Sequence, residues 1–178
     1  MREYSFKAGD IIGFSGAHVH SDFINVSTYG IPRRSISHVG IIAGSRGNNL
    51  LYEAVGTGVR ACLIIPTIKM YDGRIWVYPL YRNLYPHESR RLRESLIGEL
   101  AVPYDVRGAI RAGGFIFSHI ESLFWEQDFS SFFCSELVAS KISEIGIFPI
   151  TNASRWSPNM LVRKLRREGI VYKPVRLK

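Results

Sequence analysis

The stretch SHVGIIAGSRGNNLLYEAVG, residues 37–56, decides the fold that we expect for this chain. Two apolar runs flank the turn-forming segment SRGNN, residues 45–49. This pattern predicts two antiparallel strands joined by a short loop. Four further segments read as strands, which are residues 10–14, 58–65, 74–80 and 170–177.

Helical patterns dominate the second half of the chain. Leu92, Leu96 and Leu100 recur at helical spacing within residues 86–100. A last helix is expected after Ser157, with Pro158 at its first position and Gly169 after its end. One short helix is also expected within residues 21–30. Strands followed by helices predict an α+β domain with a mostly antiparallel sheet, and 178 residues suit a single domain, 1–178.

The formal net charge of +8 is concentrated at one end of the chain. Residues 155–178 hold eight Lys or Arg and one acid, Glu168. One interpretation is contact with an anionic partner, such as lipid headgroups, nucleic acid or an acidic polymer. The simpler interpretation is a solvated helix face followed by a charged tail.

Compartment and cofactors follow from what the sequence lacks. The N-terminus has no apolar run after its charged residues, and no stretch reaches the length of a membrane span. Cys62 and Cys134 do not make a disulfide framework, and no Cys/His cluster has zinc spacing. We therefore expect a cytoplasmic protein with two free thiols, no transmembrane segment, no cofactor and no metal.

Cys134 lies in the segment SSFFCSELVAS, residues 130–140. Ser130 or Ser131 is expected to cap a helix whose apolar stripe includes Leu137 and Val138. Cys134 would then lie near the helix N-terminus, where the dipole and unpaired N–H groups stabilise a thiolate. The alternative is an inert cysteine in the core.

A nucleophilic cysteine needs a base and a group that orients the base. Of five histidines, His38 alone begins a strongly apolar strand. Glu53 is a carboxylate within the second run of the hairpin. A four-residue loop, 46–49, would pair Ser45 with Leu50 and put His38 and Glu53 on one face, nearer together if the loop is shorter. A five-residue loop would put them on opposite faces.

These motifs together resemble a known family. The set AGDIIGFSG, SHVGIIAG, LYEAVGTGVR, VPYDV, FFCSELVA and SPNML, in this order, is similar to the circularly permuted papain-like amidohydrolases of the NlpC-like superfamily, in the YiiX/YaeF-like branch. The resemblance implies a permuted papain-like fold, in which an antiparallel sheet packs against the cysteine helix. It further implies roles for Cys134 as nucleophile, His38 as general base, Glu53 as third polar residue and Tyr104 in oxyanion stabilisation. Glu136 matches a structural acid beside the nucleophile.

The resemblance implies a cysteine-dependent amidase or peptidase that acts on a small peptide or N-acyl amino acid without a cofactor. A backbone N–H at the start of the Cys134 helix would help to hold the oxyanion. Residues 15–36 are expected to line the substrate pocket. One alternative is a thiol acyltransferase or thioesterase acting on lipid-like acyl groups. Another is a non-enzymatic module that binds an anionic partner through residues 155–178, although too few aromatics lie there to expect specific nucleic-acid binding.

Overall fold

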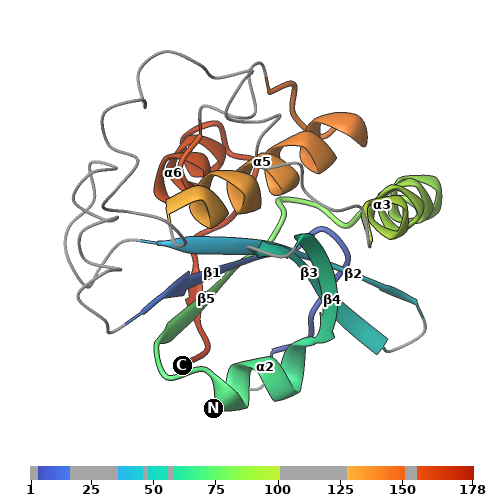
Figure 1. The fold of residues 1–178 in the computed structure, drawn as a ribbon. Coiled ribbons are helices and arrows are strands. Elements are labelled where there is room, and N and C mark those ends of the chain that lie inside the picture. The colour runs from blue at the N-terminus through green and yellow to red at the C-terminus, as the bar shows by residue number, and fades with distance from the viewer. Residues whose placement is uncertain (1–3, 17–35, 46–47, 56–57, 101–127, 151–155) are drawn as a thin grey trace, which may run out of the picture.

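A computed structural model describes residues 4–16, 36–45, 48–55, 58–100, 128–150 and 156–178 (Figure 1). The strands in these ranges are β1 (Ile11–Ser15), β2 (His38–Ser45), β3 (Asn48–Val55), β4 (Gly58–Leu63), β5 (Arg74–Tyr78) and β6 (Val175–Arg176). The helices in the same ranges are α2 (Ile64–Met70), α3 (Pro86–Glu99), α5 (Asp128–Glu144) and α6 (Pro158–Arg167).

The strands form one six-stranded sheet in the order β4-β3-β2-β1-β5-β6. Every strand pair in it is antiparallel. Helices α3, α5 and α6 lie on one side of the sheet and α2 lies on the other (Figure 1). The expected α+β class with an antiparallel sheet is therefore confirmed.

Side-chain alternation gives the sheet two buried faces. Val39, Ile41 and Ala43 of β2 pack in the larger apolar cluster, with residues of α3, α5 and α6. Ile42 of β2 and Leu51 of β3 pack in a second cluster, with residues of α2. Helices cover both faces, which explains why these strands read as nearly continuous apolar runs.

Of the two registers considered for the hairpin of β2 and β3, the structure has the one that puts His38 and Glu53 on the same face. Ser45 pairs with Asn48 and Ile41 pairs with Tyr52, so the turn is shorter than the four-residue loop that we considered. Shortening the loop by two residues preserves which side chains share a face. His38 and Glu53 consequently lie on the same face and nearer to one another than a four-residue loop would place them.

The helix boundaries predicted for α3 and α6 are confirmed. At the start of α6, the Ser157 side chain accepts a hydrogen bond from the backbone N–H of Met160 at 3.3 Å, and Pro158 is the first helical residue. Gly169 adopts φ +72° just after the helix, a conformation that favours glycine. The closing strand is shorter than expected, because β6 holds two residues.

Helix α2 was not predicted, since Ile64 and Ile65 were assigned to the strand before it. The chain leaves β4 at Leu63 and turns helical immediately. Pro66 lies in the first turn of α2, where its missing N–H has no intrahelical acceptor to lose. Ile64 and Ile68 are both buried, and their spacing of four residues puts them on one face.

The helix that carries Cys134 begins earlier than predicted. It starts at Asp128, so Ser130 and Ser131 are helical residues and not caps. Residues 128–144 contain no Gly or Pro, and an Asp is favourable in the first turn of a helix. The sequence is therefore compatible with a helix that begins at Asp128. It ends at Glu144, and Gly146 follows with φ +74°.

Three expectations fall outside the residues that the structure describes. They are the short helix at residues 21–30, most of the proposed pocket lining at residues 15–36, and Tyr104. Among the described helices, none is both long and apolar enough to cross a lipid bilayer.

Candidate functional site

His38 lies at the beginning of an inner strand of the sheet. It is the first residue of β2 and pairs with Phe14 of β1. The two rings lie with centroids 5.5 Å apart. Its side chain is 24% exposed, so the ring is held by its neighbours and still reaches the surface. A histidine in this position can contact groups from both sides of the sheet.

Glu53 is the partner of His38 within the sheet. The Nε2–H of His38 donates a hydrogen bond to Glu53 Oε2 at 2.7 Å. The Glu53 side chain is only 4% exposed. A buried carboxylate is stable only where it is paired and hydrogen-bonded, which makes this contact a fixed one. The bond occupies one ring nitrogen and leaves Nδ1 for another partner.

Arg60 holds the other oxygen of Glu53, a contact that we did not predict. Arg60 of β4 lies directly opposite Glu53 of β3. Its Nε and one Nη donate to Glu53 Oε1 at 2.9 and 2.7 Å. The register of β3 and β4 puts these two opposite charges across from one another, where they attract.

Cys134 supplies the third group from the opposite layer. It lies in α5, is fully buried and packs in the larger apolar cluster. The Cys134 side chain is also a hydrogen-bond partner of the His38 ring. The structure thus brings together Cys134, His38 and Glu53, which are far apart in the sequence.

Charges in the group formed by Cys134, His38 and Glu53, called the cluster from here on, favour a protonated His38. Burial alone would lower the pKa of the ring. The Cys134 sulfur and the Glu53 carboxylate outweigh burial and raise the pKa of His38 to about 10. Burial likewise opposes the charge on Glu53, but His38 and Arg60 outweigh it and lower the pKa of that carboxyl. A protonated imidazole beside a sulfur stabilises a thiolate, the form in which cysteine is a nucleophile.

The longer α5 corrects one expectation about the oxyanion. Cys134 is the seventh residue of this helix and not a residue at its start. In an α-helix only the first four N–H groups lack an intrahelical acceptor, and here these belong to residues 128–131. The backbone N–H of Cys134 is therefore not an unpaired donor at a helix start.

Cys62 lies on the far side of Glu53 from His38. Its sulfur is 3.8 Å from Glu53 Oε1 and accepts a hydrogen bond from the Thr67 hydroxyl at 3.4 Å. Burial raises the pKa of the Cys62 thiol; the Thr67 bond lowers it, and Glu53 adds to the rise. Cys62 is therefore a poor nucleophile in the immediate neighbourhood of the cluster.

Another histidine, His87, and the acid beside the nucleophile, Glu136, lie in the described part of the chain, and no contact given for either joins it to Cys134, His38 or Glu53. His87 is exposed on α3 and stacks on Tyr85, with ring centroids 5.8 Å apart. Glu136 is half-buried in α5, and burial raises the pKa of its carboxyl. The position of Glu136 is compatible with the structural role that we expected for it, and His87 is a surface residue.

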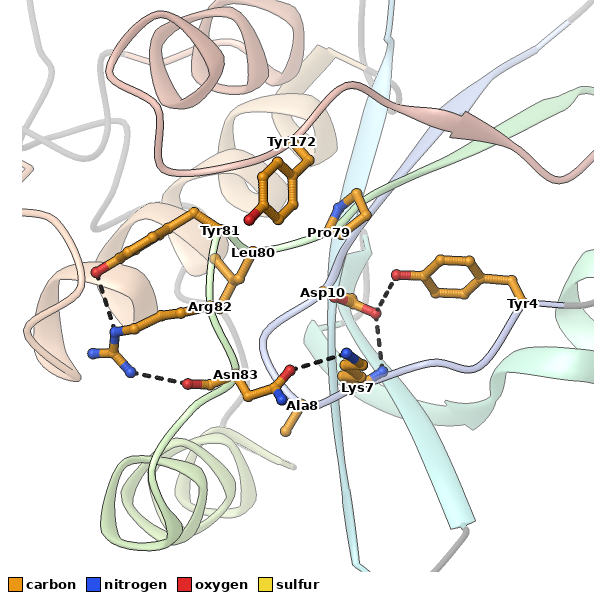
Figure 2. A pocket seen from close by; sticks show the side chains of 10 residues that line it. All are labelled: Tyr4, Lys7, Ala8, Asp10, Pro79, Leu80, Tyr81, Arg82, Asn83 and Tyr172. Atoms are coloured by element: carbon orange, nitrogen blue, oxygen red, sulfur yellow. Dashed lines mark hydrogen bonds between the residues drawn. The ribbon is translucent and has the colours of Figure 1, made fainter.

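A pocket of about 340 Å³ lies at the other end of β1 (Figure 2). Its polar side chains bond to one another. Tyr4 and the backbone N–H of Lys7 both donate to Asp10 Oδ2, at 3.0 and 2.9 Å, and Lys7 Nζ donates to Asn83 Oδ1 at 3.0 Å. These contacts attach the N-terminal segment to the chain after β5. Cys134, His38 and Glu53 do not line this pocket.

Comparison with known proteins gives the fold a relative. The chain is similar to a crystal structure described as the metalloprotein YiiX from Escherichia coli O157:H7, DUF1105. The match has a TM-score of 0.56 and 20% identity, and covers 95% of this chain and 87% of the YiiX chain. The fold is therefore YiiX-like, and at this identity the likeness extends to the fold alone. Neither the protein-family models nor the curated proteins gave a match.

Because that relative is called a metalloprotein, we tested the donor groups of this chain. Within the described ranges, no group of three or more His, Cys, Asp or Glu side chains could hold a metal ion. His38 and Glu53 are already joined by a hydrogen bond, and Arg60 also donates to Glu53. The described residues therefore do not fit a metal centre.

Proposed function

We propose that this protein is a cysteine-dependent hydrolase that cleaves an amide bond in a small peptide or N-acyl amino acid. Cys134 would be the nucleophile, His38 the acid and base, and Glu53 the group that orients His38. One observation carries the proposal: a buried thiol and a buried carboxylate both contact one imidazole ring, whose pKa is raised to about 10.

Fold and order of residues support the same reading. The histidine strand precedes the cysteine helix in the chain, as in the circularly permuted papain-like amidohydrolases of the NlpC-like superfamily that the motifs resemble. The YiiX-like fold is compatible with that branch of the superfamily. The permuted papain-like arrangement is accordingly part of the proposal.

The first chemical step forms a thioester. The Cys134 thiolate attacks the carbonyl carbon of the amide, and the carbonyl oxygen takes up negative charge. As the C–N bond breaks, the His38 imidazolium gives its proton to the leaving nitrogen, which departs as an amine. His38 is now neutral, and Glu53 keeps the ring oriented through Nε2.

The second step returns the enzyme to its starting state. Neutral His38 takes a proton from a water molecule, whose oxygen attacks the thioester carbon. The C–S bond breaks, the carboxylic acid leaves, and the thiolate and imidazolium are restored. We propose Tyr104 as a donor to the oxyanion, a role that becomes more important because the Cys134 N–H is not free at a helix start.

Acyl transfer from lipid-like groups is a second candidate, and one observation favours it. Cys134 is packed among apolar side chains of the larger cluster, including Leu137 and Val138. An acyl chain would be accommodated better in such surroundings than a charged peptide would. The chemistry at Cys134 would be the same, with an alcohol or amine replacing water in the second step.

The test is to look for the acyl-enzyme. Purified protein would be incubated with a panel of N-acyl amino acids, γ-linked peptides and short acyl thioesters, and intact mass followed by peptide mapping would locate any adduct. We expect an acyl group on Cys134 from at least one amide. An adduct from thioesters alone would favour the acyl-transfer candidate.

Cys62→Ala is the matched control, because it removes the other thiol near Glu53. We expect Cys62→Ala to retain the adduct and Cys134→Ala to lose it. If the adduct maps to Cys62, or persists in Cys134→Ala, the proposed site is wrong.

A further inference from the structure

Arg60 reaches Glu53 from the surface of the molecule. It lies on β4, an edge strand of the sheet, and its side chain is 60% exposed, whereas that of Glu53 is 4% exposed. Two N–H groups of its guanidinium converge on Glu53 Oε1, at 2.9 and 2.7 Å. His38 holds the other oxygen, Oε2, at 2.7 Å. One carboxylate therefore lies between two groups that can each carry a positive charge.

The other titratable groups around this carboxylate carry no positive charge. Cys62 lies 3.8 Å from Glu53 Oε1. Burial, together with the charge of Glu53, raises the pKa of Tyr71, which follows α2. Cys134 of α5 contacts the His38 ring. Thiols and phenols are neutral or negative, so none of these groups can replace the guanidinium as a partner of the carboxylate.

A cation on Glu53 has a definite effect on His38. A carboxylate beside an imidazole favours the protonated ring, and a cation close to that carboxylate reduces the effect. Burial lowers the pKa of His38, while the Cys134 sulfur and Glu53 raise it to about 10. Without Arg60, the full charge of Glu53 would act on the ring, and His38 would hold its proton more tightly.

The proposed reaction requires His38 to release that proton and to stay neutral for a time. The imidazolium gives its proton to the leaving nitrogen as the thioester forms, and the neutral ring then accepts one from the attacking water. A ring held too firmly in its charged form would slow both steps at neutral pH. Arginine stays protonated in proteins, so Arg60 also remains as a partner for the buried carboxylate while His38 is neutral.

We propose that Arg60 is a positioning residue that binds Glu53 and thereby limits how basic His38 becomes. The inference rests on the proposed function, because it assigns a further role in the same reaction. Arg60 would act through Glu53 and His38, without contact with the substrate. A purely structural ion pair between β3 and β4 would stabilise the sheet and leave the titration of His38 as it is.

Titration of the His38 ring by NMR tests this role without a substrate. In the Cys62→Ala background, the ring nitrogens would be labelled with ¹⁵N and Cys134 blocked with methyl methanethiosulfonate, so that its sulfur is uncharged as in a thioester. Removing the sulfur charge should bring the pKa of His38 below about 10. We then expect two opposite shifts, since Arg60→Gln should raise this pKa by about 0.5 or more and Glu53→Gln should lower it.

Further variants separate the contact with Glu53 from other effects. Arg60→Lys keeps a cation beside the carboxylate, so His38 should titrate close to its wild-type pKa. Arg60→Met is a second neutral variant, which should raise the pKa of His38 as Arg60→Gln does. Arg90→Gln removes one charge from an exposed position on α3 and should not change the titration. Circular dichroism and melting temperature establish that each variant is folded.

The outcomes distinguish the role of Arg60 from the proposed function. An unchanged or lower pKa of His38 in the two neutral variants, or an equal rise in Arg90→Gln, would overturn the positioning role and leave the proposed function intact. A His38 titration that does not respond to the blocking of Cys134 would instead contradict the contact on which the proposed function depends.

Discussion

Glu53 is the residue that joins the sheet to the proposed chemistry. Its two oxygens are divided between His38 and Arg60, and it is almost completely buried. A group held in this way can fix the tautomer and the direction of an imidazole without contacting the substrate. Changes at Glu53 should therefore alter activity through His38.

Glu53→Gln should lower activity much less than Cys134→Ala. The amide oxygen of Gln can still accept the Nε2–H of His38, although the charge is gone. We expect a loss of about 10- to 100-fold in kcat/KM, smaller than the 10²- to 10⁴-fold that a positioned base supplies. Steady-state kinetics on the substrate identified by mass spectrometry measures it. Unchanged activity would mean that another residue orients His38.

Acid should expose the contribution of Glu53 to stability. Its pKa in the folded protein lies below the ordinary 4.5, so the folded state binds its proton less readily than the unfolded state does. The stabilisation is present above pH 4.5 and is lost as the pH falls through the folded pKa. Urea unfolding should find wild type about 1.5–3 kcal/mol more stable than Glu53→Gln at pH 7.

That gap should narrow steadily below pH 4.5. A gap that stays constant between neutral pH and pH 3 would show that the Glu53 charge does not stabilise the fold. The free energy of unfolding of Arg60→Gln, measured over the same pH range, provides the comparison. This variant removes the second partner of the carboxylate and leaves Glu53 titratable.

At the scale of elements, β2 and β3 determine the geometry of the cluster. Gly40 lies between His38 and Ile42 on one face of β2. A Cβ at this position would be 2.8 Å from the backbone oxygen of Tyr52 and 3.3 Å from the Cβ of Glu53. The absence of a side chain therefore lets the two strands approach where Glu53 meets His38.

Gly40→Ala should disturb both the sheet and the cluster. Since the clash is with backbone, it cannot be relieved by a side-chain rotation alone. We expect a loss of about 1–3 kcal/mol in the free energy of unfolding, together with reduced activity. Gly98→Ala on α3 is the control, because no atom lies within 4 Å of a Cβ there. Equal stability of the two variants would contradict the close approach.

Helix α5 brings the cysteine to this strand end by packing across β2 and β3. Lys141, near its C-terminal end, is buried and bonds to Ser95 and Glu99 of α3, at 2.6 and 2.7 Å. These contacts fix α5 against α3 in addition to its apolar face. Contacts along the length of α5, and not only those of its first turn, therefore fix the position of Cys134.

For the molecule as a whole, the sequence predicted what local patterns determine. Two nearly continuous apolar runs and a Gly/Asn turn predicted the hairpin, whereas the length of its loop decided whether Glu53 shares a face with His38. Ser157, Pro158 and Gly169 marked the ends of α6 because each has a specific role in helix termination. The α+β class followed from the order of these elements.

The features that we did not predict depend on tertiary contacts, which the sequence of a single segment does not show. Ile64 and Ile65 suit a strand as well as a helix, and burial of Ile64 and Ile68 against the sheet decides between them. No Gly or Pro marks the start of α5 in the sequence. Arg60 becomes part of the cluster only through its pairing with Glu53 across two strands.

The central claim is that His38 activates Cys134. Its most direct test is the rate at which methyl methanethiosulfonate modifies each cysteine at pH 6.5, followed by peptide mapping. The His38 ring, whose pKa is raised, contacts the Cys134 sulfur, whereas burial, aided by Glu53, raises the pKa of the Cys62 thiol. We predict that Cys134 reacts at least about tenfold faster than Cys62 and loses this advantage in His38→Ala. Equal rates, faster modification of Cys62, or a Cys134 rate unchanged by His38→Ala would contradict the account.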